Sequence, residues 1–162
     1  MNNNKPPFSR NLFPACDYIP KNIIKEMKDA TLASAEDKLE RGFRICSSTG
    51  TIEGMNGKNT IIQEKCEGTE RCMSITGKCP SNTRPMSFFH THPKTRLTYP
   101  SVADKIHTDV HGYKFLCIGG ANHHIRCMPS DVPFISPGPT AVELRKFFQK
   151  WKEEVKDCII DV

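Results

Sequence analysis

The sequence predicts a single domain of the α+β or α/β class, with helices flanking a mixed or mostly antiparallel sheet. Three observations support this fold class. The chain has 162 residues, of which 37% are hydrophobic, enough for one domain with a sizeable core. Segments with helical and strand periodicity alternate along it. An apolar segment that ends in two histidines is followed by a helical pattern and then by another apolar strand, so helices should pack on a sheet that carries these histidines.

The first elements are an arm and a helical region. We expect residues 1–18 to form a flexible arm, because Met1 to Ala15 is rich in Asn and Pro and has little apolar content. Pro20 suits the first turn of a helix. Apolar residues then recur at helical spacing from about Lys21 to Glu40, which predicts either one broken helix or two short ones.

Short strands and a long loop are expected next. Gly42 to Cys46 alternates as a strand does and runs into a turn at residues 47–50. Thr51–Glu53 and Thr60–Ile62 are short strand candidates on either side of an Asn-Gly turn. Residues 64–84 are rich in Gly, Thr, Ser and Asn, so we predict a long loop inserted into the core, and long loops in compact domains are usually functional or disordered.

The eight cysteines include no Cys-x-x-Cys pair, so the usual zinc-ribbon signature is missing. Four of them lie in apolar segments and are expected to be small buried hydrophobic residues: Cys46, Cys117, Cys127 and Cys158. Cys66, Cys72 and Cys79 lie in the polar insertion. They could be free thiols, form a disulfide or hold a structural metal, and we favour free thiols.

The second half of the chain repeats the strand and helix pattern. A strand over 86–91 precedes a helix that Ser101 opens and that ends near Gly112. A hairpin over 113–128 completes a core of residues 19–128. Residues 129–162 are predicted to be a Pro-rich linker and an amphipathic helix whose apolar stripe, from Leu144 to Ile159, packs on the core rather than on a partner.

Charge and hydropathy exclude some classes of protein. The formal net charge is +5, with basic and acidic residues interspersed rather than in a basic stripe, which argues against a nucleic-acid partner. No run approaches the roughly 20 apolar residues that span a bilayer, so we expect no membrane partner. The N-terminus lacks the apolar core of a signal peptide, and we therefore expect a cytoplasmic protein.

The most informative pattern is His90-x-His92-Pro93 followed by Ser101-x-x-Asp104. Side chains alternate along a strand, so both imidazoles should lie on one face. Asp104 falls one turn into the helix that Ser101 opens and could supply a third ligand. Two imidazoles and a carboxylate with an open fourth position are a ligand set that catalytic Zn²⁺ uses.

Together these motifs resemble the JAMM (MPN-plus) zinc metalloprotease family, with features of its RadC-like relatives. The family signature is an upstream Glu, then His-x-His-Pro, then Ser-x-x-Asp, and the similarity covers roughly Ala33 to Met128. The resemblance implies a mixed sheet flanked by helices, with His90, His92 and Asp104 as zinc ligands. It also implies that Ser101 donates a hydrogen bond to the tetrahedral intermediate.

The chain departs from the family pattern at two places. Eight residues separate His92 from Ser101, one more than in the common pattern, and a loop tolerates such an insertion at little cost. The upstream Glu, which the resemblance implies to be the general base, is best matched by Glu40, although one residue rather than two separates it from Gly42. Glu53 and Glu36 are the alternatives.

Three functions are compatible with the motifs. The first is a zinc-dependent metallopeptidase or isopeptidase that cuts an amide bond in a protein or peptide, such as the tail of a ubiquitin-like modifier. The second is a non-catalytic interaction scaffold of the same fold, in which the ligands are typically lost. The third is a RadC-like metal-dependent hydrolase acting on nucleic acid. We favour the first because all three ligand residues are present.

Overall fold

The computed structural model describes residues 13–56, 59–70, 72, 78–95, 98–132, 134, 140–154 and 156–162, with only the backbone at 152–154. Its helices are α1 (Ala15–Tyr18), α2 (Lys21–Asp37), the 3₁₀ helix η1 (Glu53–Asn56), α3 (Val102–His111) and α4 (Ala141–Glu154). Its strands are β1 (Glu40–Ser47), β2 (Thr60–Thr69), β3 (Arg84–His92), β4 (Phe115–Gly120), β5 (His124–Pro129) and β6 (Cys158–Asp161). No helix among these residues is long and apolar enough to cross a bilayer.

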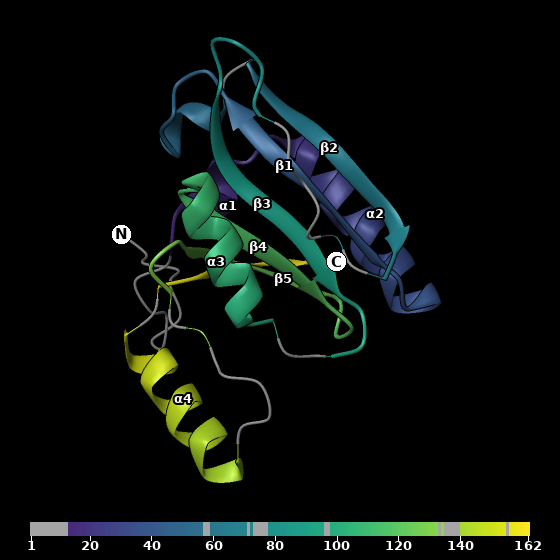
Figure 1. Cartoon of the computed structure of the whole chain (residues 1–162), viewed down its shortest axis with the longest axis vertical. Helices are drawn as coiled ribbons and strands as arrows, with labels where there is room; N and C mark the ends of the chain where they lie inside the picture. The colour runs from purple at the N-terminus through teal and green to yellow at the C-terminus, as the bar shows by residue number, and fades with distance from the viewer. Residues whose placement is uncertain are drawn as a thin grey trace, which may run out of the picture.

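The strands form one mixed sheet in the order β2-β1-β3-β4-β5-β6. Only the central pair, β3 and β4, is parallel, and α3 connects these two strands. α1 and α2 cover one face of the sheet and α3 lies on the other, while α4 extends away from one end of the body (Figure 1). The predicted fold class, helices flanking a mixed sheet in one domain, is confirmed.

The sheet has a hydrophobic core on each face, because its side chains alternate. On one face, Ile23 and Met27 of α2 belong to the same fully buried cluster as Phe43, Phe89 and Phe115 of the strands. On the other face, a second cluster contains Leu116, Ile118, Met128, Val132 and Trp151. α2 and α3 are therefore on opposite sides of β3, and a side chain on the α3 side is separated from α2 by the sheet.

Three local predictions are wrong. Residues 13–18 of the expected arm pack on the core, because Phe13 and Ala15 are buried and α1 begins there. Thr51–Glu53 is no strand, since η1 starts at Glu53. The insertion is only partly a loop, because β2 runs to Thr69 and pairs with β1 along the edge of the sheet. Residues 1–12, Gly57 of the predicted turn and residues 71 and 73–77 of the insertion lie outside the described residues.

The cysteine predictions are also wrong, because all eight cysteines are paired. The disulfides are Cys16–Cys158, Cys46–Cys79, Cys66–Cys72 and Cys117–Cys127. Each cysteine of the polar insertion therefore has a partner, and those of the apolar segments are cross-links rather than unpaired hydrophobic residues. Sequence spacing alone does not determine such pairings, since eight cysteines allow about 105 of them.

The C-terminal segment differs from the single helix that its apolar stripe predicts. α4 ends at Glu154, and Cys158 and Ile159 belong to β6, which pairs with β5. Thr140 and Glu143 form a capping box at the start of α4. Its contacts with the body come from Phe147, Phe148 and Trp151, which pack against Tyr99, whereas Val142 is 57% exposed.

Candidate metal centre

The two histidines lie at the carboxyl end of β3, the parallel partner of β4. His90 and His92 are two residues apart and therefore on the same face of the strand, opposite Ile118 and Gly120 of β4. The chain leaves β3, forms α3 and returns to β4, so the first turn of α3 follows the end of β3. This crossover brings Asp104 of α3 to His90 and His92 on the α3 side of the sheet.

Residues between and beside the histidines hold the end of β3 in place. The buried hydroxyl of Thr91 points to the opposite face, where it accepts a hydrogen bond from the Arg41 amide and donates one to Ser34 Oγ of α2, both at 2.9 Å. Gly42 of β1 lies opposite His90. A Cβ atom at this glycine would lie 2.5 Å from the Phe89 carbonyl oxygen, so the close approach of β1 to the histidine strand requires a glycine.

Ser101 and Asp104 form a capping box that fixes the start of α3. Ser101 Oγ accepts from the Asp104 amide at 3.1 Å, and Asp104 Oδ2 accepts from the Ser101 amide at 2.9 Å. The aspartate is thus held by the helix N-terminus, where a negative charge is favourable. Gly112, with a φ of 67°, ends the helix as predicted.

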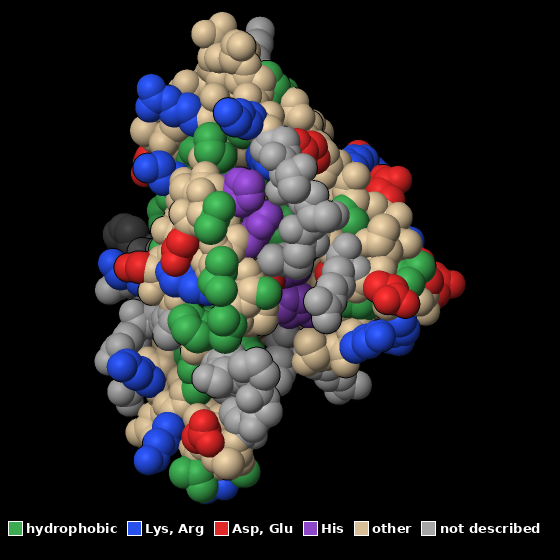
Figure 2. Space-filling view, viewed as in Figure 1, with side chains coloured by type: hydrophobic (Ala, Val, Ile, Leu, Met, Phe, Trp, Pro, Cys, Tyr) green, Lys and Arg blue, Asp and Glu red, His purple; other side chains and the backbone are tan. Residues whose placement is uncertain are grey.

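The three side chains converge on one point. His90 Nε2 lies 2.8 Å from Asp104 Oδ1 and 2.9 Å from His92 Nε2, and His92 Nε2 lies 3.2 Å from Asp104 Oδ2. The His90 and Asp104 side chains are 2% and 4% exposed, whereas that of His92 is 18% exposed. The cluster is therefore closed on the protein side and reaches solvent beside His92; histidine side chains are visible on this face of the molecule (Figure 2).

The electrostatics of the cluster favour a cation. Burial opposes a charge on His90, but the adjacent Asp104 carboxylate outweighs it and raises the pKa of the imidazole. Burial would likewise raise the pKa of Asp104, yet His90 and His92 together hold it well below its usual range. Asp104 is thus a carboxylate at neutral pH, and the site offers negative charge to a proton on His90 or to a metal ion.

The donor set fits a divalent metal ion. One ligand atom each from His90, His92 and Asp104 lies within 4.8 Å of the others, and two nitrogens with one carboxylate oxygen suit Zn²⁺. The partly exposed His92 leaves a side from which a fourth ligand could approach. One feature is unusual for a metal ligand: among the described residues, none gives the buried Nδ1 of His90 a hydrogen-bond partner.

Glu40 lies beside this cluster. Gly42 is opposite His90, so Glu40, two residues earlier in the antiparallel strand, is on the same face and next to His92. A hollow of about 240 Å³ is lined by both Glu40 and His92, together with Lys38, Glu70, Pro93, Lys94 and Thr95. Glu40 Oε1 accepts a hydrogen bond from the Cys72 amide at 2.9 Å, which fixes the carboxylate at the wall of the hollow.

The two alternative bases are not brought to the cluster. Glu53 is exposed in η1, which follows the far end of β1. Glu36 is exposed near the end of α2, the helix on the opposite face of the sheet. Ser101 is near the ligands through its capping box, and its hydroxyl, which accepts from the Asp104 amide, keeps a hydrogen to donate.

His107 and His111 lie behind the cluster. Their rings are 4.5 Å apart, and the His107 ring is 4.5 Å from that of Phe88. Desolvation, with help from His111, lowers the pKa of His107 to about 4, so it is neutral at pH 7. The hydrogen bonds found for the Asp104 carboxylate within the described chain come from Ser101, His90 and His92. His107 and His111 therefore belong to an aromatic cluster and do not orient the aspartate.

Three residues of the site were not predicted from the sequence: Cys72, Lys38 and Lys94. Cys72 reaches Glu40 because the Cys66–Cys72 disulfide folds the chain after β2 back toward β1, and no periodicity indicates such a contact. Lys38 and Lys94 line the hollow although nothing in their spacing suggests it. Gly42 had a detectable signal, since a glycine inside an apolar strand indicates a close backbone approach.

Comparisons with protein-family models, with curated proteins and with solved structures find no match to this chain.

Proposed function

We propose that the chain is a zinc-dependent metallopeptidase or isopeptidase of the JAMM type. The observation that carries this proposal is the convergence of His90, His92 and Asp104 beside a hollow that Glu40 lines. A structural zinc site normally uses four protein ligands, whereas a catalytic one uses three and leaves a position for water or substrate. The proposed ligand set has three members and is accessible at His92.

Each residue has a role that follows from its place. Zn²⁺, when bound, would polarise the scissile carbonyl and lower the pKa of a water molecule toward about 7. Glu40 would take the proton of the attacking water and deliver it to the leaving amine. The Cys72 amide, by donating to Glu40, would keep the Glu40 carboxylate turned toward the hollow. Ser101, through its free hydroxyl hydrogen, would stabilise negative charge on the carbonyl oxygen.

The hollow limits the substrate. About 240 Å³ accommodates a short segment of chain around the scissile bond, not a folded protein. Its walls carry both lysines and glutamates, namely Lys38, Lys94, Glu40 and Glu70, which favours polar main chain over a large apolar side chain. A flexible peptide, such as the tail of a ubiquitin-like modifier, fits these limits.

The test compares Glu40→Gln with the wild type, using zinc content and hydrolysis of peptide and isopeptide libraries. The variant keeps the ligands, so it should bind zinc as before. Loss of the general base should lower kcat by about 10² to 10⁴-fold. Glu36→Gln and Glu53→Gln are matched controls and should keep both properties. Full activity of Glu40→Gln, or hydrolysis that survives complete zinc removal, would refute the mechanism, and cleavage of nucleic acid alone would favour a RadC-like activity.

The paired cysteines bear on where the protein works. Disulfides persist in oxidising compartments and are rare in the cytosol of most cells. The four bonds therefore favour an oxidising environment for this form of the chain. The cytoplasmic location expected from the sequence stays a prediction, and it would require these cysteines to exist as thiols.

A further inference from the structure

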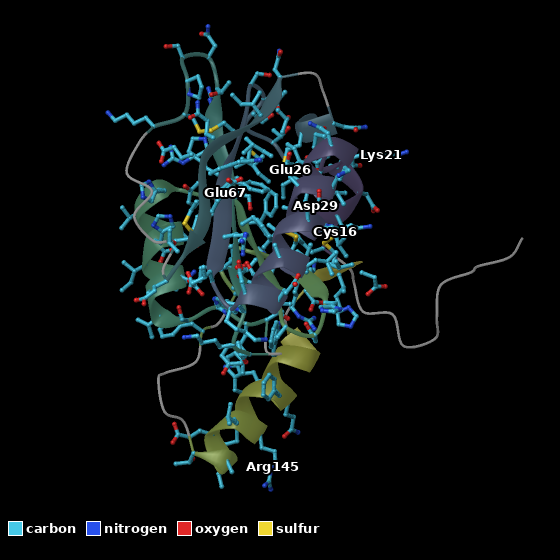
Figure 3. All side chains as sticks on the ribbon, turned by 90° about the vertical axis from the view of Figure 1, so that its right-hand side faces the viewer. Cys16, Lys21, Glu26, Asp29, Glu67 and Arg145 are labelled. Carbon is cyan, nitrogen blue, oxygen red and sulfur yellow. A yellow bond between two sulfur atoms is a disulfide. The ribbon has the colours of Figure 1, made fainter. Side chains whose placement is uncertain are left out.

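Four cysteines from three parts of the chain meet at the end of the sheet that carries β6. The Sγ atoms of Cys16, Cys127 and Cys158 lie within 4.8 Å of one another, and the sulfur of Cys117 is bonded to that of Cys127. Cys16 is labelled in Figure 3, next to α2 and the sheet. Two disulfides, Cys16–Cys158 and Cys117–Cys127, are thus immediate neighbours.

The backbone holds these sulfurs together independently of the bonds between them. Cys117 of β4 is the register partner of Cys127 of β5, and Cys127 is the partner of Cys158 of β6. Register partners share a face, so three thiols form a row across three hydrogen-bonded strands. α1 packs against β5 and β6 and places Cys16 over this row.

We infer that, when both disulfides are reduced, the chain binds a zinc ion through Cys16, Cys117, Cys127 and Cys158. A tetrahedral site with Zn–S bonds of about 2.3 Å separates its sulfurs by about 3.8 Å. The Sγ atoms of Cys16 and Cys158 each lie within 4.8 Å of Cys127 Sγ, which approaches this spacing, and Cys117 Sγ is bonded to Cys127 Sγ. Bonded partners would have to separate by less than about 2 Å, which small side-chain rotations can supply.

The surroundings suit a structural thiolate site. Cys117 and Cys127 are fully buried and Cys158 is 7% exposed, whereas Cys16 is partly exposed, so most of the cluster is closed to water. The Cys16 amide donates to Cys158 Sγ at 3.3 Å, the kind of contact that orients and stabilises a metal-bound thiolate. Four protein ligands would leave no open position, so this site would stabilise the fold rather than catalyse a reaction.

Reduction of the two disulfides can be written with a dithiol as the reductant. Each disulfide takes up two electrons and two protons, giving two cysteine thiols, while one dithiol becomes a disulfide. Binding of Zn²⁺ to the four thiols then releases four protons, because the thiolate is the ligand. Disulfides and zinc are thus alternative cross-links at one position in the fold.

The other two disulfides provide the internal control. Within the described part of the chain, neither Cys46–Cys79 nor Cys66–Cys72 has a third ligand group close enough to form such a cluster. Reduction should therefore leave these four thiols without zinc.

The experiment uses the full chain, reduced with a phosphine, incubated with or without Zn²⁺ and treated with iodoacetamide. Mass spectrometry of the peptides should show slow alkylation, only in the presence of zinc, of Cys16, Cys117, Cys127 and Cys158. Cys46, Cys66, Cys72 and Cys79 should be alkylated equally fast with and without zinc. Equal alkylation of all eight, or zinc protection of the second set, would overturn the inference.

Co²⁺ gives a readout that is independent of the histidine site. Thiolate ligands produce an intense near-ultraviolet charge-transfer band, which imidazole and carboxylate ligands do not. The reduced wild type should show this band, and the oxidised protein should not. Cys127→Ser/Cys158→Ser should lose it, whereas Cys66→Ser/Cys72→Ser, with the same number of thiols removed, should keep it. A band that survives the first double variant would also contradict the inference, and none of these results depends on the proposed hydrolysis.

Discussion

Asp104→Asn separates the metal-binding role of this residue from its structural one. The carboxylate is almost fully buried and accepts hydrogen bonds from Ser101 as well as from the two histidines. An asparagine has nearly the same volume and keeps one oxygen for the Ser101 amide, so the start of α3 should survive. What disappears is the negative charge between His90 and His92.

The expected loss can be estimated from the ligand set. Zinc sites with four ligands bind with about 10–16 kcal/mol, or about 3 kcal/mol per ligand. Loss of one ligand should therefore raise the Kd for zinc by roughly 100-fold. The pKa of His90 should fall in the same variant, because the carboxylate that raises it is gone.

Competition with a chromophoric zinc chelator measures this Kd, on oxidised protein so that the cysteines bind no metal. Asp109→Asn is the matched control, since Asp109 lies on the same helix, is 60% exposed and carries the same charge. Its zinc affinity should equal that of the wild type. Wild-type affinity in Asp104→Asn, or an equal loss in both variants, would refute the ligand assignment.

Two further predictions concern stability in the metal-free protein. Gly42→Ala should lower the free energy of unfolding by about 1–3 kcal/mol, because the new Cβ would press on the Phe89 carbonyl beside His90; an unchanged denaturant midpoint would contradict this close packing. His107 has a pKa of about 4 when folded and 6.5 as its ordinary value, so the unfolded chain binds more protons between these limits. Stability should therefore fall, by at most about 3 kcal/mol, as the pH drops from 6.5 to 4. His107→Gln should lose this part of the pH dependence, and an identical slope in both proteins would show that another group is responsible.

The fold was predictable where local chemistry determines it. Ser101 and Gly112 delimit α3 because one caps its first turn and the other adopts a left-handed conformation at its end. The apolar run before His90 is a buried central strand, as its composition indicates. The prediction of a single C-terminal helix up to Ile159 was wrong, because the strand Cys158–Asp161 follows the helix and the sequence has no clear signal for the end of the helix.

The cysteines were not predictable for a different reason. Cys16 and Cys158 are 142 positions apart and meet only because α1 and β6 pack at the same end of the sheet. Burial in an apolar segment is equally typical of a free cysteine and of a buried disulfide. Which cysteines pair therefore depends on how the strands are arranged, and the spacing of the cysteines along the sequence does not reveal that arrangement.

At the candidate site, local sequence patterns already indicated which groups share a face and which residue opens the helix. The period of two puts His90 and His92 side by side, and Ser-x-x-Asp puts Asp104 in the first turn of α3. Two facts came from the three-dimensional arrangement alone: α3 returns along the side of the sheet where the histidines point, and Glu40 rather than Glu36 or Glu53 lies there. Both facts depend on strand pairing and on the β3-α3-β4 crossover, which are long-range contacts, whereas periodicity and capping act within a few residues.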